Sequence, residues 1–427
     1  MRFNLKVWHL LVLVCGALII LRLGLILNSL LLFIRFVMLL INSPSNGIPQ
    51  VSFPLIDSFL AAALVITMPV YFYLERKKYK IFSKRLNFTS VILLVLLIFF
   101  LLAPIVANWN PYFQKDLSVT RLLPPLSSLK VLHLKQKEND GDTALGKFIK
   151  LKNQVVKQPF NEELIFADSL KSGQNIVFYQ HGASFEIPID TLKTTNGRPL
   201  ITTKYFILGT DELGRDIFSR LVYGARISLF VGLGSVVISL LIGLFLGFIA
   251  GYPGGPIDSV ISRITDMFLA FPVIFLIILI LALFGNSLVS VIVVLGFSGW
   301  MSLFKIVRGE VILLKKKDFF ISAKLIGLSK ISLLLKEVLP VILAPVIVNL
   351  VFQYSNVILA EAALSYLGLG TGSIYPSWGS MIEAGQNYLA QAWWMIFFPG
   401  FLLTLTLLAA NNLGKEINSF FNPRIKL

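Results

Sequence analysis

The chain alternates long apolar runs with short polar connections. Each run approaches the roughly 20 residues that a helix needs to cross about 30 Å of hydrocarbon. Backbone groups in lipid must be satisfied within their own segment, which favours helices. The pattern therefore predicts an all-α membrane protein, a polytopic bundle of about eight transmembrane helices. The predicted spans lie near residues 8–30, 51–73, 88–109, 226–251, 264–284, 287–307, 341–363 and 393–413.

The first apolar run continues to residue 42 and contains Arg22 and Arg35. We expect one tilted helix followed by an interfacial helix, with both arginines extending their charged ends toward the membrane surface. We do not expect a cleaved signal peptide, because the stretch is too long and no small-residue cleavage site closes it.

Basic residues concentrate in two short connections, at 75–85 (ERKKYKIFSKR) and from Lys315 to Lys336. Such connections usually stay in the cytoplasm. Four predicted spans separate them, so both can lie on that side, together with both termini. The polar stretch 110–208 then lies outside the cytoplasm. It contains NIVFYQ and SFEIPI, which are rich in β-forming residues and predict a small, partly β lobe.

Composition agrees with a membrane protein, since 56% of the residues are hydrophobic and 14% are charged. The net charge of +16 belongs to loops that orient the chain, so no nucleic-acid partner is expected. Cys15 is the only cysteine and the three histidines are scattered, which argues against a metal site. We find neither a phosphate-binding GxxxxGK[ST] loop nor a GxSxG elbow. We therefore expect no catalytic residue and no cofactor.

GTDELGRDIFSRLVYGARISL, from residue 209, mixes charge and glycine just before an apolar span. Asp211 is expected to cap a short helix, and Asp216 is expected to pair with Arg220 four residues later. The segment resembles the signature that opens the core of peptide and nickel ABC importer permeases, at the outer face. These residues either fix an interfacial helix, which we favour, or contact substrate. The matching residues are Gly209, Asp211, Gly214, Arg215, Asp216, Ser219, Arg220, Tyr223, Gly224, Arg226 and Ser228.

A second stretch, 309–340, resembles the cytoplasmic coupling loop of ABC importer permeases, a short helix, a glycine turn and a second helix that docks on the ATPase subunit. The acidic residue of the family motif is replaced by Ile321, which puts pairing with a standard ATPase surface in question. The alternative is a basic loop lying on anionic lipid. The residues that match the motif are Ala323, Lys324, Gly327, Leu328 and Pro340.

The segments 358–370, 376–389 and 411–424 also resemble this family. Within the first, Glu361 either lines the translocation path or makes a hydrogen bond to a neighbouring helix. Glycines at 243, 247 and 251 repeat every four residues, a spacing that favours close packing of two helices.

The resemblance implies a type I ABC importer permease in the bacterial inner (cytoplasmic) membrane. Its implied partners are membrane lipid, a second homologous permease, two cytoplasmic ABC ATPase subunits and an extracytoplasmic solute-binding protein. The implied cargo is a dipeptide or oligopeptide. Nickel or another small solute is an alternative, and a secondary transporter, a channel or a membrane scaffold is a more distant one. The predicted parts are additional helices and a basic linker (1–86), a first core helix (87–109), an extracytoplasmic insert (110–208) and the core (209–427).

Overall fold

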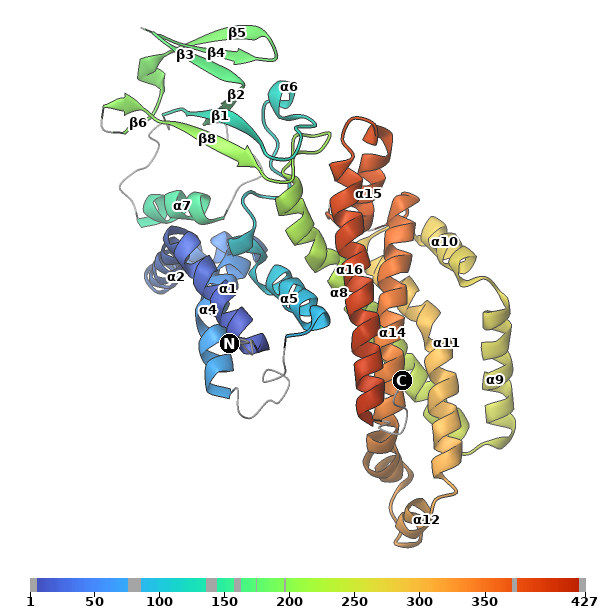
Figure 1. Ribbon diagram of the computed structural model, residues 1–427. Helices are drawn as coiled ribbons and strands as arrows, with labels where there is room; N and C mark the ends of the chain where they lie inside the picture. The colour runs from blue at the N-terminus through green and yellow to red at the C-terminus, as the bar shows by residue number, and fades with distance from the viewer. Residues whose placement is uncertain are drawn as a thin grey trace, which may run out of the picture. The chain divides into compact units, whose positions relative to one another are not determined.

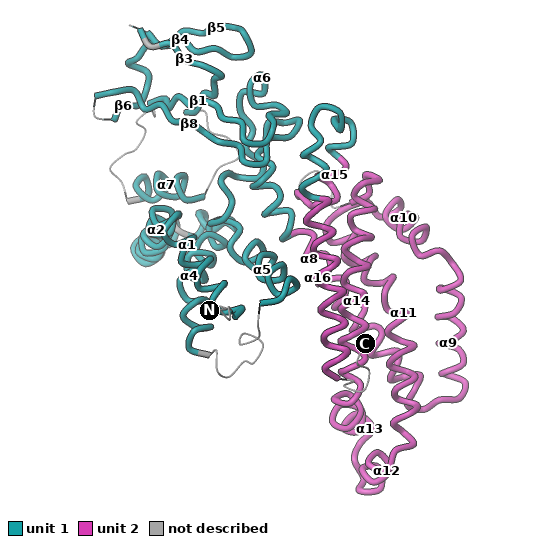
Figure 2. Tube along the Cα trace, in the orientation of Figure 1, with its two compact units in different colours: residues 1–226, 384–399 teal, residues 227–383, 400–427 magenta. Residues whose placement is uncertain are grey.

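The computed structural model describes residues 6–75, 86–135, 144–156, 163–173, 175–195, 197–370 and 375–421 (Figure 1). The chain divides into two compact units, shown in Figure 2. Unit 1 comprises 1–226 and 384–399, and unit 2 comprises 227–383 and 400–427. The basic connection at 75–85 lies outside the described residues apart from Glu75, so the orientation derived from it stays a prediction.

Unit 1 begins with apolar helices that pack on one another. A cluster around Leu11, Ala62 and Leu102 joins α1, α4 and α5. Burying such side chains contributes about 1.5–3 kcal/mol each in water, and inside lipid the same contacts act through close packing. The elements are α1 (Val7–Leu21), α2 (Leu23–Asn42), α3 (Pro44–Gly47), the 3-10 turn η1 (Ile48–Gln50), α4 (Phe53–Glu75) and α5 (Phe88–Val106).

The first expected span is wrong in its boundaries. The helix breaks at Arg22, and α2 is long and apolar enough to cross a membrane, whereas α1 has 15 residues. Residues up to 42 therefore belong to α2 rather than to a separate interfacial helix. Arg22 does not extend freely to the surface, because its guanidinium donates to the carbonyl of Val106 at 3.5 Å and to the side chain of Asn108.

The insert after α5 folds into a lobe with three small antiparallel sheets, ordered β2-β1-β8, β3-β4-β5 and β6-β7. The expected β-rich segments are β4 and most of β5. Side chains of Val131, Phe166 and Phe206 form one core of the lobe. The elements are α6 (Leu117–Thr120), β1 (Ser127–His133), α7 (Ala144–Val155), β2 (Leu164–Ala167), β3 (Ser169–Ser172), β4 (Asn175–Gln180), β5 (Ala183–Pro188), η2 (Ile189–Thr191), β6 (Thr194–Thr195), β7 (Arg198–Pro199) and β8 (Ile201–Phe206).

Helix α7 connects the lobe to the N-terminal helices. Its Phe148 is fully buried in a cluster with Leu32 of α2 and Leu55 of α4. Arg35 of α2 donates to the carbonyl of Lys147 at 3.1 Å. The two additions that the sequence places outside the usual permease plan therefore pack against each other within unit 1.

Unit 2 is a bundle of long helices. Seven described helices of the whole chain are long and apolar enough to cross a membrane, or eight if α9 and α10 form one bent span. The expected polytopic bundle is therefore confirmed. The elements are α8 (Ile217–Gly251, starting in unit 1), α9 (Gly255–Ala270), α10 (Val273–Phe284), α11 (Leu288–Leu314), α12 (Asp318–Leu325), α13 (Lys330–Ser332), the π-helix η3 (Leu333–Val338), α14 (Leu339–Tyr366), α15 (Trp378–Gly385, ending in unit 1) and α16 (Trp394–Phe421, starting in unit 1). The 3-10 turn η4 (Gln386–Tyr388), between α15 and α16, belongs to unit 1.

The expected span at 264–284 is not one continuous helix. Helices α9 and α10 meet at 87° across a break at Phe271 and Pro272. Proline lacks an N–H group and disfavours helical geometry in the preceding residue, so the helix ends there and a new one starts with Pro272 as its N-cap. Apolarity over the segment indicated burial in lipid but not this change of direction.

The glycine repeat on α8 is a packing surface against α11. Ideal Cβ atoms at Gly243, Gly247 and Gly251 would lie within 3 Å of side-chain atoms of α11. At Gly247 the nearest is Val307 Cγ1, at 2.6 Å. The two helices therefore approach more closely than any larger residue allows.

We expect Gly247→Ala to lower the free energy of unfolding by about 1–3 kcal/mol, because the methyl group must displace Val307 and α11. Gly400→Ala is the matched control, since Gly400 is helical and an ideal Cβ there meets nothing within 4 Å. The midpoint temperature of unfolding in detergent measures both variants. Equal midpoints for the two would contradict the close contact between α8 and α11.

Candidate functional site

The signature segment forms a tight turn before α8, organised by Asp211. Its Oδ1 accepts from the N–H of Leu213 at 2.9 Å and of Arg215 at 2.8 Å. Its Oδ2 lies 2.7 Å from Arg215 Nε and 3.4 Å from Arg220 Nε. Asp211 is 2% exposed. One carboxylate therefore closes the turn and neutralises two largely buried guanidinium groups.

Two expected roles in this turn are wrong. Asp211 caps no helix; Asp216, just before α8, does so by accepting from the N–H of Ser219 at 2.9 Å and its Oγ at 2.6 Å. Arg220 pairs with Asp211 rather than with Asp216, although the four-residue interval between Asp216 and Arg220 suits an ion pair. The carboxylate at an N-cap is directed to the first-turn N–H groups, which leaves it unavailable four residues later.

Glycines permit the backbone of this turn. Gly209 has φ +81°, and an ideal Cβ there would lie 2.5 Å from the carbonyl oxygen of Leu123. Gly214 has φ +69°, and its Cβ would collide with the hydroxyl of Thr120. Indole Nε1 of Trp394 donates to the carbonyl of Thr210 at 3.0 Å. Because Leu123, Thr120 and Trp394 enclose this turn, the structure favours a structural role of the signature segment over direct contact with substrate.

The remaining signature residues continue along α8. Gly224 is buried. Arg226 pairs with Asp57 of α4 at 2.6 Å and donates to the carbonyl of Leu101 in α5 at 3.2 Å. Its guanidinium carbon lies 5.8 Å from the ring centre of Tyr223. Arg226 therefore joins the start of α8 to α4 and α5 within unit 1, a contact that the sequence did not predict because Asp57 lies far away in the chain.

Lys204 of β8 lies beside this turn, with its ammonium 4.1 Å from the ring centre of Trp109. Burial lowers the pKa of Lys204 to about 8, and the charge of Asp216 opposes this shift in part. Burial also raises the pKa of Asp216. Desolvation disfavours both charged forms, so neither group is held in its ordinary hydrated state.

We expect the Lys204 amine to titrate near pH 8 and Trp109→Ala to raise that pKa toward 10.5, because the substitution opens the site to water. In the unsubstituted protein, the Lys204 amine holds its proton between pH 8 and 10.5 more fully in the unfolded chain than in the folded one. The free energy of unfolding should therefore rise with pH across that window, by up to roughly 3 kcal/mol. NMR of ¹³C-methylated lysine, assigned with Lys204→Arg, measures the midpoint. The same midpoint with and without Trp109 would contradict this account.

Glu361 is fully enclosed in unit 2. Its carboxylate accepts from Ser365 Oγ at 2.8 Å and from Ser228 Oγ at 3.3 Å, and the same Ser228 oxygen accepts from the N–H of Trp378 at 3.2 Å. The exposed fraction of Glu361 is 0%. The geometry therefore favours the hydrogen bond between neighbouring helices over a place on the translocation path.

The predicted coupling loop forms an elbow, which we define as residues 318–338, from α12 to η3. Gly327 has φ +91° and follows α12. Its N–H donates to the carbonyl of Lys324 at 3.1 Å, and the N–H of Leu328 donates to that of Ala323 at 3.3 Å. These two bonds define a Schellman motif, in which glycine adopts the left-handed conformation that other residues avoid. Pro340 lies in the first turn of α14.

The elbow has an inner and an outer apolar surface. Phe320, Ala323 and Leu328 pack inward against a cluster that includes Val311 of α11 and Leu333 of η3. Lys324 is exposed. The outermost apolar side chains are Leu325 and Ile326, which are 82% and 83% exposed. Sequence reasoning missed these two, although they directly precede the glycine. Ile321, Ile331 and Leu335 are exposed as well.

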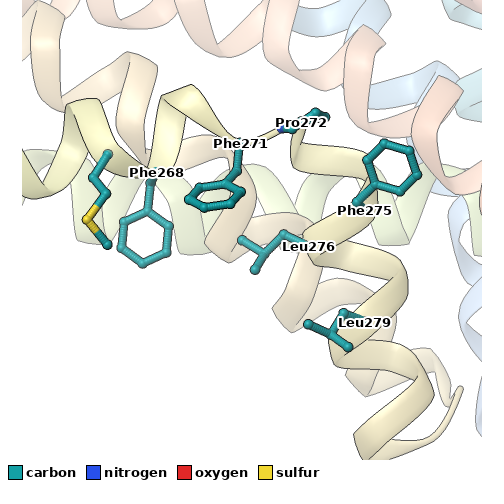
Figure 3. A pocket seen from close by; sticks show the side chains of 7 residues that line it. Phe268, Phe271, Pro272, Phe275, Leu276 and Leu279 are labelled. Carbon is teal, nitrogen blue, oxygen red and sulfur yellow. The ribbon is translucent and has the colours of Figure 1, made fainter.

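Figure 3 shows a hollow at the break between α9 and α10. Its volume is about 340 Å³, and all of its lining side chains are apolar. It offers no side-chain hydrogen-bond partner to a charged or polar solute. Among the described residues, no group of three or more His, Cys, Asp and Glu side chains is arranged to hold a metal ion. The lining residues are Met267, Phe268, Phe271, Pro272, Phe275, Leu276 and Leu279.

Comparison with known proteins identifies this architecture. Residues 243–427 match the family model described as binding-protein-dependent transport system inner membrane component. The dipeptide transport system permease protein DppC of Bacillus subtilis (strain 168) is 40% identical over 219 residues, which are 51% of this chain and 68% of that relative. The oligopeptide transport system permease protein OppC of the same strain is 35% identical over 218 residues, 51% of this chain and 72% of that relative.

The chain therefore belongs to the family of binding-protein-dependent transport system inner membrane components, the membrane-spanning permeases of ABC transporters. Within it, the relatives above are peptide permeases, as the resemblance of the five sequence segments predicted. The subunit is a non-catalytic one, and ATP hydrolysis belongs to partner ATPases. Among solved structures, an inward-facing MetNI methionine ABC transporter chain matches 46% of this chain and 95% of its own, with 18% identity and a TM-score of 0.37.

Proposed function

We propose that this chain is a permease subunit of an ATP-driven peptide importer in the bacterial inner (cytoplasmic) membrane, where it forms half of the translocation path. The observation that carries the proposal is the 40% identity to a dipeptide permease over 219 residues. That match covers about two thirds of the relative. Nickel or another small solute is the competing cargo.

The proposed partners are a second homologous permease, two cytoplasmic ATPase subunits and an extracytoplasmic solute-binding protein. The elbow supports the ATPase contact, because Leu325 and Ile326 present an apolar tip that is suited to a groove on another protein. Ile321, in place of the family's acidic residue, adds to the same exposed apolar surface. The inner side of the elbow packs on Val311 of α11 and Ile342 of α14, so that motion of the exposed tip can pass into the bundle through packed side chains.

The proposed organisation keeps 1–86 and 110–208 as additions around a permease core made of 87–109 and 209–427. Contacts of α7 with α2 support a joint role for both additions. The Asp57–Arg226 ion pair shows that α4 also touches α8. Assembly of the complex after deletion of residues 1–74 measures how far the core depends on them.

Uptake by the complete complex in proteoliposomes tests the function. A labelled dipeptide should accumulate only when the solute-binding protein is outside and ATP is inside, together with this chain. Ni²⁺ uptake in parallel vesicles tests the competing cargo. Accumulation driven by a proton gradient without ATP would contradict an ABC importer and favour a secondary transporter.

A further inference from the structure

A line of polar side chains crosses three helices of unit 2. Lys305 of α11 forms an ion pair with Asp266 of α9, with Nζ 2.8 Å from Oδ1. One turn away, Asn349 of α14 donates from Nδ2 to Ser302 Oγ of α11 at 3.3 Å. Gln353 follows Asn349 by one turn on α14. We call these five residues the polar lane.

The polar lane reaches deep into the apolar region. Gln353 lies against Gly299, because an ideal Cβ on that glycine would collide with its amide nitrogen. At 1.5 Å per residue, Gly299 lies about 22 Å along α11 from its end at Leu314, and Lys305 lies about 14 Å from that end. The hydrocarbon layer is about 30 Å thick, so Gln353 lies too deep for its polar end to extend to the membrane surface. Extension of long side chains to the surface therefore does not account for the whole polar lane.

Several polar atoms of the lane have no partner within the described part of the chain. Gln353 Nε2, Gln353 Oε1 and Asn349 Oδ1 are buried without a hydrogen bond. The side chains of Lys305 and Asp266 are 51% and 63% exposed, even though they form an ion pair. Such groups are costly next to lipid, and in membrane proteins they face water, a ligand or another polar surface.

Helix α9 separates a polar face from an apolar one. Ile257, Val260 and Ile264 are all about half exposed, and at 100° per residue they share one face. Asp266 and Arg263 lie on another, also exposed, face. A surface for lipid or for apolar packing is thus present elsewhere on the same helix. The exposed polar face is therefore best matched to an aqueous path.

We propose that the polar lane lines the part of the translocation path nearest the elbow, with Lys305 contacting the carboxylate and Asp266 the ammonium end of a peptide. The assignment of cargo rests on the proposed function. When the path is empty the two side chains neutralise each other. When a zwitterionic peptide arrives, Lys305 can exchange the carboxylate of Asp266 for the peptide carboxylate. Asp266 can likewise exchange the ammonium of Lys305 for the peptide ammonium. The amides of Asn349 and Gln353 supply donors and acceptors for peptide backbone groups, which every peptide sequence carries.

Cysteine accessibility in the assembled complex tests the location. In a Cys15→Ser background, Ser302→Cys and Asn349→Cys should react with a charged, water-soluble thiosulfonate reagent at least about tenfold faster than Val260→Cys on the apolar face of α9. A saturating dipeptide, with binding protein and ATP present, should slow that reaction. Unreactive lane cysteines in complexes that still transport would overturn the proposal and place the lane against lipid or the second permease.

Charge variants test the contact with peptide termini. Lys305→Met should lower ATP-dependent uptake of a free dipeptide by about tenfold or more, as expected for loss of one charge-assisted hydrogen bond. The same variant should change uptake of a C-terminally amidated dipeptide by less than about threefold. The double variant Lys305→Asp with Asp266→Lys keeps an ion pair and controls for folding. Equal losses for the free and the amidated peptide would contradict the carboxylate contact.

The results separate the two proposals. Peptide uptake with an inaccessible lane would overturn the lane and leave the importer function standing. ATP-driven uptake of a non-peptide solute alone, with an accessible lane, would overturn the peptide function and the assignment of Lys305 and Asp266 to peptide termini.

Discussion

Asp211→Ala is expected to lower the free energy of unfolding by about 3–5 kcal/mol and to prevent accumulation of folded protein in the membrane. The substitution leaves Arg215 and Arg220 without their shared carboxylate, and both guanidinium groups are more than nine-tenths buried. Removing one partner of a buried ion pair costs this much because the other charge stays desolvated. The turn also loses the acceptor for two backbone N–H groups.

Two variants separate these contributions. Asp211→Asn keeps an oxygen for the N–H groups of Leu213 and Arg215 but removes the charge, so it should be less damaging than alanine. Glu212→Gln should have the smallest effect, since Glu212 is the more exposed of the two carboxylates that contact Arg215. Size-exclusion profiles and unfolding midpoints of the solubilised protein give the order. An alanine variant as stable as Glu212→Gln would show that the turn does not depend on Asp211.

Ile326→Glu is expected to weaken binding of the ATPase subunits by tenfold or more while leaving the permease folded. Ile326 is 83% exposed, so the substitution buries nothing in the free chain. In the proposed complex it would place a charge in an apolar groove, at a cost of 2 kcal/mol or more, roughly. Co-purification of the ATPases and ATP-dependent uptake measure the loss.

Ile207→Glu is the matched control for the elbow variant. Ile207 is 47% exposed and follows β8 in the lobe, away from the elbow in the sequence. The Ile207→Glu substitution introduces the same negative charge as Ile326→Glu and should leave binding of the ATPase subunits unchanged. If Ile326→Glu co-purified with the ATPases as well as this control, the elbow would not be the docking element.

The general architecture could be predicted from the sequence because it depends on local signals. Apolar runs of sufficient length identified the spans, and the resemblance of 309–340 to a family coupling loop indicated the elbow around Gly327. The contacts of Arg22, at the break between α1 and α2, could not be predicted, since Val106 and Asn108 lie far along the chain, at the end of α5 and just beyond it. The 87° bend could have been suspected from Pro272, although a proline is also compatible with a mild kink.

The site was harder to predict than the fold. The interval between Asp216 and Arg220 suits an ion pair, but the direction of each side chain decides the partner, and an N-cap directs its carboxylate toward the helix start. The exposure of Leu325 and Ile326 likewise follows from the orientation of α12 about its own axis, which places Phe320 and Ala323 in the inner cluster. The polar lane consists of single polar residues on three helices, and only their packing brings them together.

The elbow follows α11 and leads into α14, so these two helices form a hairpin whose closed end carries the exposed side chains of Leu325 and Ile326. Their lane residues Ser302 and Asn349 are then held in fixed alignment. Helix α9 lies outside this hairpin and meets α11 through Asp258–Arg308 and Asp266–Lys305. Two ion pairs, one helical turn apart along α11, therefore hold α9 against the hairpin.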